Sequence, residues 1–179
     1  MRQRGSFIVP GWGTIQAIWQ ADKLLLLQLT ESLLPGFAGA QKATDMSDPF
    51  LTEVQAQVEA FLTGRLQQLD LPHVLPTQPS FQALLLRSAQ QIPYGQVLSY
   101  GGLAAKAGRP RAARAAGSAM ASNTLFLLVP CHRVIAAGRR LGGYGGRPDL
   151  KRRLLALEGI TVTAENRVLP RNINEDNLY

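Results

Sequence analysis

The sequence has few of the residues that build disulfide-rich, metal-binding or membrane-spanning proteins. Its 179 residues include one cysteine, Cys131, and two histidines, His73 and His132. One cysteine cannot form an internal disulfide, and three such residues do not supply the usual ligands of a zinc site, so we expect no metal. No apolar run approaches the length of a membrane span, and the apolar stretch 7–9 is too short for a signal-peptide core. These shortages predict a cytoplasmic protein without a membrane partner.

Acidic residues are almost absent from the middle of the chain. Residues 81–153 contain twelve lysines and arginines but a single acid, Asp149, whereas residues 1–80 contain five basic and seven acidic residues. Eleven of the nineteen basic residues lie between Lys106 and Arg153, around the cysteine. A concentrated positive field attracts polyanions, nucleic acid above all. The charge distribution therefore predicts a nucleic-acid partner, with a plain solvated surface as the alternative.

The residue patterns predict a chain of two main parts. Alternating and continuous apolar residues predict strands within 12–29, and Asp48 or Thr52 is suited to begin a helix that ends at Gly64. A stretch with three prolines follows and has no periodicity, which is typical of a linker. The expected parts are an N-terminal α/β domain (1–72), a linker (73–79), a mostly helical domain (80–159) and a polar, loosely held tail (160–179).

Two short helices are predicted in the second part, joined by a turn that contains glycine and proline. Ser99 is suited to cap the first helix, and residues 111–121 form the second. The pair has the outline of a helix-turn-helix, although many helical domains contain such a pair without binding DNA. Arg111, Arg114 and Ser118 share one face of the second helix, which otherwise consists mainly of small residues. Because it lacks the Asn and Gln that read base edges, this helix predicts close, largely sequence-independent contact with DNA.

Cys131 and His132 lie in a run that is otherwise apolar. A free cysteine in such a segment is usually part of a core. Adjacent residues of an extended segment point to opposite faces, so His132 can reach the sulfur only through a turn or a bridging water. An imidazole that is itself oriented by a carboxylate activates a nucleophile, and Glu158 is the best candidate for that carboxylate. From the residues alone, an inert core cysteine and an activated nucleophile both remain open.

From about Phe81 to Gly159 the chain resembles the 6-O-alkylguanine-DNA alkyltransferase family, also called methylated-DNA–protein-cysteine methyltransferases. The motifs that carry the resemblance, with their spacing, are Ile92-Pro93-Tyr94-Gly95, Ser99-Tyr100, Ala112-Ala113-Arg114-Ala115, Asn123, Val129-Pro130-Cys131-His132-Arg133-Val134, Gly143-Tyr144 and Leu154-Leu155-Ala156-Leu157-Glu158-Gly159. Residues 1–80 match only loosely. The resemblance implies a small RNase H-like α/β domain followed by a mostly helical domain with a helix-turn-helix.

The resemblance also implies a reaction. Cys131 takes an alkyl group from the 6-oxygen of guanine in a flipped-out base, irreversibly and once per molecule, without a cofactor; 4-O-methylthymine is an open second substrate. His132 acts as its base through a water, and Glu158 orients His132. Asn123 ties the helix-turn-helix to the active-site turn. Tyr100 helps to turn the nucleotide out and assists the departing guanine.

The implied DNA complex is a duplex bound through the minor groove by a monomer, with cooperative assembly along DNA left open. Arg114 enters the base stack in place of the flipped nucleotide. The residues implied in DNA binding are Tyr100, Arg111, Ala112, Ala113, Arg114 and Ser118, and those lining the pocket are Met120, Val134, Tyr144 and Gly145. Gly145 stands where several family members have serine. The zinc ligands of some animal members are missing from the N-terminal part.

Three other functions compete with this interpretation. A lesion-binding protein that does not react is disfavoured because such relatives replace the cysteine. A transcriptional regulator is disfavoured because residues 111–121 offer few base-reading side chains. A Cys-His hydrolase is disfavoured because the basic stretch 81–153 suits DNA better than a peptide.

Overall fold

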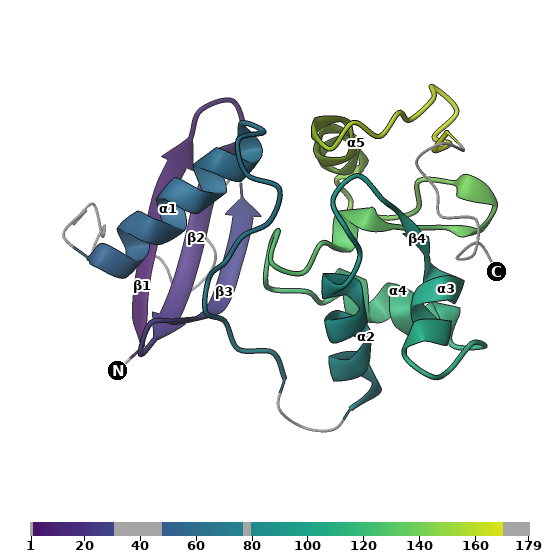
Figure 1. Ribbon diagram of the computed structural model, residues 1–179, viewed down its shortest axis with the longest axis horizontal. Helices are drawn as coiled ribbons and strands as arrows, with labels where there is room; N and C mark the ends of the chain where they lie inside the picture. Colours follow the sequence, from purple (N-terminus) through teal and green to yellow (C-terminus); the bar gives the residue numbers. More distant parts are fainter. Residues whose placement is uncertain (1, 31–47, 77–79, 170–179) are drawn as a thin grey trace. The chain divides into compact units, whose positions relative to one another are not determined.

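The computed structural model describes residues 2–30, 48–76 and 80–169, which form two compact units (Figure 1). The described residues up to Val74 belong to the first unit together with Thr124–Leu128. Those from Leu75 to Asn123 and from Val129 onward belong to the second. Both units contain helices and strands, so the predicted α/β class is confirmed. No helix in these described stretches is long and apolar enough to cross a membrane.

The first unit is an antiparallel sheet packed against one helix. Its strands are β1 (Gln3–Val9), β2 (Gly13–Gln20) and β3 (Lys23–Thr30), in the order β1-β2-β3. Helix α1 (Pro49–Leu62) runs along the sheet (Figure 1). It begins where the sequence predicts, because the Asp48 carboxylate accepts hydrogen bonds from the first free backbone N–H groups of the helix, at 2.9 and 3.0 Å.

Strand β1 lies outside the predicted strand region 12–29, and its absence from the prediction has a clear cause. Polar residues occupy much of the strand, and one of its buried positions is Gly5, so the alternation of Gly5, Phe7 and Val9 is hard to see. The glycine is needed for packing. A Cβ at this position would lie 2.6 Å from Cδ2 of Leu51 on α1, so the helix approaches the strand closely only because no side chain intervenes.

The open edge of β3 is covered by two segments from later in the chain. Leu24 pairs with His73, and Leu27 pairs with Leu125, each through an isolated parallel bridge. The backbone of Leu27 donates to Thr124 O at 2.8 Å and accepts from the N–H of Phe126 at 2.8 Å. The five residues 124–128 therefore belong to the first unit, although they fall within the predicted domain 80–159.

The second unit is mostly helical. Its elements are α2 (Phe81–Gln90), β4 (Leu98–Ser99), α3 (Tyr100–Lys106), α4 (Ala113–Ala121), the 3-10 helix η1 (Cys131–Arg133), β5 (Val134–Ile135), the 3-10 helix η2 (Ala137–Arg139) and α5 (Pro148–Leu157). Strands β4 and β5 pair in parallel. Ser99 caps α3 as predicted, through a 2.9 Å bond from the N–H of Gly102. Helix α4 begins at Ala113 rather than at residue 111, because the N–H of Ala112 is bonded in a turn to Arg109 O.

The predicted tail is part of the second unit as far as the structure describes it. Ile160 and Val168 are buried in a cluster with Val97, Ile135, Leu141 and Leu155. The strand expected at 160–163 is reduced to an isolated bridge between Val162 and Val168. Residues 160–169 are therefore packed against the core rather than loosely held, and the remainder of the predicted tail lies outside the described residues.

Candidate active site

Cys131 lies at the start of a tight turn and not in an extended segment. Residues 131–133 form η1, and the N–H of Arg133 donates to Pro130 O at 2.9 Å. In this turn Cys131 remains partly accessible while His132 is fully buried. The sulfur lies 3.4 Å from Nδ2 of Asn123 and 3.7 Å from the hydroxyl of Tyr144. The cysteine therefore faces two polar groups at the edge of the core.

Asn123 connects the end of α4 to this turn. Besides contacting the sulfur, its amide donates to Val129 O at 3.1 Å. One side chain thus holds both the backbone just before the turn and the sulfur itself. The connecting role that the family resemblance implies for Asn123 stays a prediction.

His132 and Glu158 form a buried pair. Nε2 of His132 lies 2.7 Å from Oε1 of Glu158, and both side chains have no exposed surface. Nδ1 of His132 is also buried and has no hydrogen-bond partner within the described residues. Burial lowers the pKa of His132 below its ordinary value, and this effect outweighs the opposing influence of Glu158. A neutral imidazole that donates from Nε2 leaves the Nδ1 lone pair available to accept a proton.

Arg133 explains how Glu158 tolerates burial at the C-terminal end of α5. Its Nε lies 3.0 Å from each carboxylate oxygen, and its Nη2 lies 2.9 Å from Oε1. Arg133 also donates to Ile92 O at 2.7 Å, and the N–H of Gly95 donates to Glu158 Oε2 at 3.0 Å. Burial alone would raise the pKa of Glu158, but bonds and charges from His132 and Arg133 hold it below its ordinary value. These donors offset the helix dipole, which opposes negative charge there.

The sequence interpretation gave Arg133 no role and did not mention Lys151 as a site residue. The Lys151 side chain is fully buried, and Nζ donates to Val134 O and Leu141 O at 2.6 Å each. Burial lowers the pKa of Lys151 to about 8. The sequence does contain a signal for the burial of Lys151. This residue precedes Leu154 and Leu155 by three and four positions, so it shares their buried face of α5. For Arg133, the only signal was that a buried Glu158 requires a cationic partner.

Tyr100 and Tyr144 border the sulfur from two different segments. The Tyr100 hydroxyl donates to Gly143 O at 3.3 Å. A Cβ on Gly142 would lie 3.2 Å from Cε2 of Tyr100, so the glycine allows the loop to lie against the ring. Burial raises the pKa of Tyr100, and burial followed by proximity to Cys131 raises that of Tyr144 well above its ordinary value. Both phenols therefore keep their protons at neutral pH.

The other pocket candidates occupy different surroundings. Met120 and Val134 are buried. Gly145 has a φ of +56°, and a Cβ there would meet nothing within 4 Å. A serine at this position would thus have space but would adopt a strained backbone conformation.

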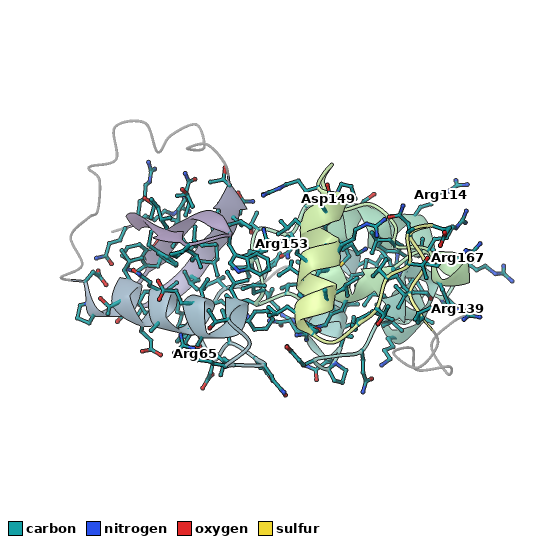
Figure 2. The ribbon with its side chains drawn as sticks, turned by 90° about the horizontal axis from the view of Figure 1, so that it is seen from above. Arg65, Arg114, Arg139, Asp149, Arg153 and Arg167 are labelled. Carbon is teal, nitrogen blue, oxygen red and sulfur yellow. The ribbon has the colours of Figure 1, made fainter. Side chains whose placement is uncertain are left out.

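Apart from Tyr100 on α3, the side chains expected to contact DNA lie on or just before α4. Arg111, Arg114 and Ser118 are exposed, whereas Ala112 and Ala113 are half-buried. The Arg114 side chain extends outward from the second unit (Figure 2). The structure therefore gathers Cys131, His132, Glu158, Asn123, Tyr100 and Tyr144 into one region. It presents Arg114 of α4, and Arg111 just before that helix, to solvent.

Comparison with known proteins gives consistent matches. Residues 80–160 match the family profile described as "6-O-methylguanine DNA methyltransferase, DNA binding domain". The chain is 39% identical over 113 residues to the methylated-DNA–protein-cysteine methyltransferase of Methanosarcina acetivorans, covering 63% of this chain and 72% of that protein. It is 46% identical over 102 residues to the protein of the same name from Mycolicibacterium paratuberculosis, covering 57% of this chain and 61% of that protein.

Solved structures agree over most of the chain. The crystal structure of Mycobacterium tuberculosis O6-methylguanine methyltransferase matches with a TM-score of 0.74 and 31% identity, covering 88% of this chain and 93% of that one. The structure of M. tuberculosis OGT in complex with DNA matches with a TM-score of 0.73 and 33% identity, covering 87% and 92%. The similarity therefore extends beyond the region 80–160.

Proposed function

Because the chain belongs to the methylated-DNA–protein-cysteine methyltransferase family, we propose that it repairs DNA by moving an alkyl group from 6-O-methylguanine to Cys131. The observation that carries the proposal is the arrangement around the sulfur. An accessible thiol lies within 3.7 Å of two polar side chains, and the next residue is a buried histidine paired with a carboxylate. The same proposal includes 4-O-methylthymine in DNA as a second substrate to be tested.

The reaction is an in-line displacement at the alkyl carbon. The sulfur of Cys131 forms a bond to that carbon as the bond between carbon and the guanine 6-oxygen breaks. The electron pair of the broken bond leaves with guanine, which takes up a proton. The thiol proton passes through a water to Nδ1 of His132, the ring atom without a protein partner. The thioether formed on Cys131 does not readily release its alkyl group, so each molecule reacts once. The cysteine itself is the acceptor, so no cofactor is required.

Neighbouring side chains position the reacting groups. Asn123 holds the sulfur and the backbone of Val129 in place. In this proposal the Tyr100 hydroxyl gives up its hydrogen bond to Gly143 O and assists the departing guanine. Because Arg133 keeps Glu158 ionised, Glu158 accepts a hydrogen bond from Nε2–H of His132 and so fixes the histidine tautomer. Met120, Val134, Tyr144 and Gly145 complete the pocket in this proposal.

An alkylated base inside a duplex is out of reach of the sulfur, so the nucleotide must be flipped out at a cost of a few kcal/mol. We propose that α3 and α4 act as a helix-turn-helix in the minor groove and that Arg114 fills the gap in the base stack. Arg114 is exposed and the residues around it have small side chains. Both features support this role, because a helix with small side chains can approach the DNA backbone closely. Arg111, Ala112, Ala113 and Ser118 complete the DNA-facing surface.

The remaining parts of the proposal concern the protein as a whole. The chain acts as a cytoplasmic monomer that binds duplex DNA with little regard to sequence. The first unit is an RNase H-like domain. Its three-stranded antiparallel sheet with one packed helix supports that relationship.

The test is the intact mass of the protein after mixing with duplex that contains 6-O-methylguanine. We expect a gain of one methylene per molecule, located by peptide mapping on Cys131, together with restored guanine in the DNA. Cys131→Ala is the matched control and should gain no mass. Unchanged mass in the folded wild-type protein would refute alkyl transfer, and binding of the lesion without reaction would favour a lesion-binding protein instead.

A further inference from the structure

Three arginines, which we call the arginine ridge, stand on two paired segments of the second unit: Arg139, Arg140 and Arg167. Arg140 and Arg167 oppose each other in an isolated antiparallel bridge. The N–H of Leu141 donates to Asn166 O at 2.8 Å, and the N–H of Val168 donates to Arg139 O at 2.9 Å. These two bonds flank the pair, so the arginines occupy a non-hydrogen-bonded site, where opposing Cα atoms are about 4.5 Å apart and side chains are closest.

This pairing is unfavourable for the protein alone. Like charges directly opposite each other in a sheet destabilise it. All three arginines are exposed, and within the described residues none has a carboxylate at ion-pair distance. Among the residues that the structure describes, these side chains donate only to backbone carbonyls, from Arg140 to Ala137 O at 3.3 Å and from Arg167 to Gly138 O at 2.9 Å. The ridge is therefore a positive surface that the described part of the chain does not neutralise.

Backbone conformation adds an independent observation. Arg139 has a φ of +60°, a left-handed conformation that asparagine and glycine adopt far more readily than arginine. Such outliers persist where the surrounding structure holds them, and they concentrate at functional sites. The turn thus places a cation at a position where an uncharged asparagine would suit the backbone better.

The ridge is connected to the candidate pocket through a few residues. Leu141, which follows Arg140, is buried, and Gly142 lies against the Tyr100 ring. Figure 2 shows Arg114, Arg139 and Arg167 toward the same end of the second unit, whereas Arg153 lies on the other side of α5. A DNA strand that delivers a nucleotide to the pocket would continue past this loop.

We propose that the arginine ridge binds the phosphate backbone of the DNA strand next to the flipped nucleotide, as a second contact surface separate from α4. Phosphates would bridge the opposing guanidinium groups and remove their mutual repulsion. The proposal rests on the proposed function, because it takes DNA as the partner.

The test measures the affinity for undamaged duplex as salt is varied from about 50 to 300 mM. Each phosphate contact contributes about 0.9 to the slope of log K against log salt, so R140Q/R167Q should flatten the slope by about 1.8. At about 0.15 M salt the same loss corresponds to roughly 30-fold weaker binding. Arg153→Gln removes another exposed charge, on α5, and should leave the slope unchanged. Equal slopes for R140Q/R167Q and the wild type, or an equal reduction in R153Q, would overturn the proposal.

Arg139→Asn separates binding from folding. Asparagine tolerates the left-handed conformation, so R139N should melt at the same temperature as the wild type or higher. It should nevertheless lose about 0.9 from the salt slope. An unchanged slope in this folded variant would overturn the proposal even if R140Q/R167Q failed to fold. Because undamaged duplex is used, the result does not depend on whether Cys131 reacts.

Discussion

Lys151 gives the second unit a pH-dependent stability that Lys151→Met should remove. Burial lowers the pKa of this lysine to about 8 from an ordinary 10.5, so the folded chain releases the proton at lower pH than the unfolded chain does. Between pH 8 and 10.5 the unfolded chain therefore binds more protons, and the free energy of unfolding rises with pH. Below pH 8 both forms hold the proton, and this gain is absent.

The size of the effect follows from the two pKa values. Between about pH 7 and pH 9.5, Lys151 should add about 2 kcal/mol to the free energy of unfolding. The neutral amine still has two N–H groups, enough for both Val134 O and Leu141 O. Deprotonation therefore relieves the burial of charge without removing the two bonds.

Urea unfolding across this pH range checks the prediction. The wild type should gain about 2 kcal/mol more than Lys151→Met as the pH rises. Lys106→Met, which removes an exposed lysine of α3, should behave like the wild type. Other groups that titrate in the range are common to all three proteins and cancel in the comparison. Parallel pH profiles for the wild type and Lys151→Met would refute the reasoning.

Two further predictions concern the active-site histidine and the glycine loop. Because burial lowers the pKa of His132, the single-turnover rate of alkyl transfer should stay level as the pH falls to about 6.5 and decline only below it; a decline centred above that pH would contradict a buried, neutral base. Gly142→Ala should lower the free energy of unfolding by about 1 kcal/mol more than Gly145→Ala. Both glycines have positive φ, but only at Gly142 would a Cβ meet the Tyr100 ring, at 3.2 Å. Equal losses in urea unfolding would show that this contact does not matter.

The sequence predicted the parts of the structure that depend on local pattern. Asp48 and Ser99 cap helices as expected, because capping needs only a short polar side chain next to a helical run. Strand β1 was missed because Gly5 occupies one of its buried positions. The apolar run around Cys131 by itself suggests an extended strand, and nothing in that pattern reveals the bond from Arg133 to Pro130 O; only the family resemblance implied a turn at the active site.

The buried charges of the site were the hardest features to predict. Cys131 and Glu158 were candidates from their residue types and positions, and the motifs around them carry the family resemblance that implies their roles. Arg133 and Lys151 were missed because basic side chains are ordinarily assigned to the surface, and their burial depends on partners distant in sequence. Arg133 is satisfied by Ile92 and Glu158, which lie 41 and 25 residues away along the chain.

The position of Glu158 at the end of α5 determines when, during folding, Cys131 gains the groups that assist it. The Glu158 carboxylate joins the backbone at Gly95, the guanidinium of Arg133 and the ring of His132, three points spread along the second unit. Cys131 is added to the growing chain 27 residues before Glu158. Until α5 docks, His132 has no carboxylate to set its tautomer and Arg133 has no anion to hold. The cysteine therefore acquires its complete set of assisting groups only when the second unit closes on itself, and a nascent chain keeps its single acceptor in an unassisted state.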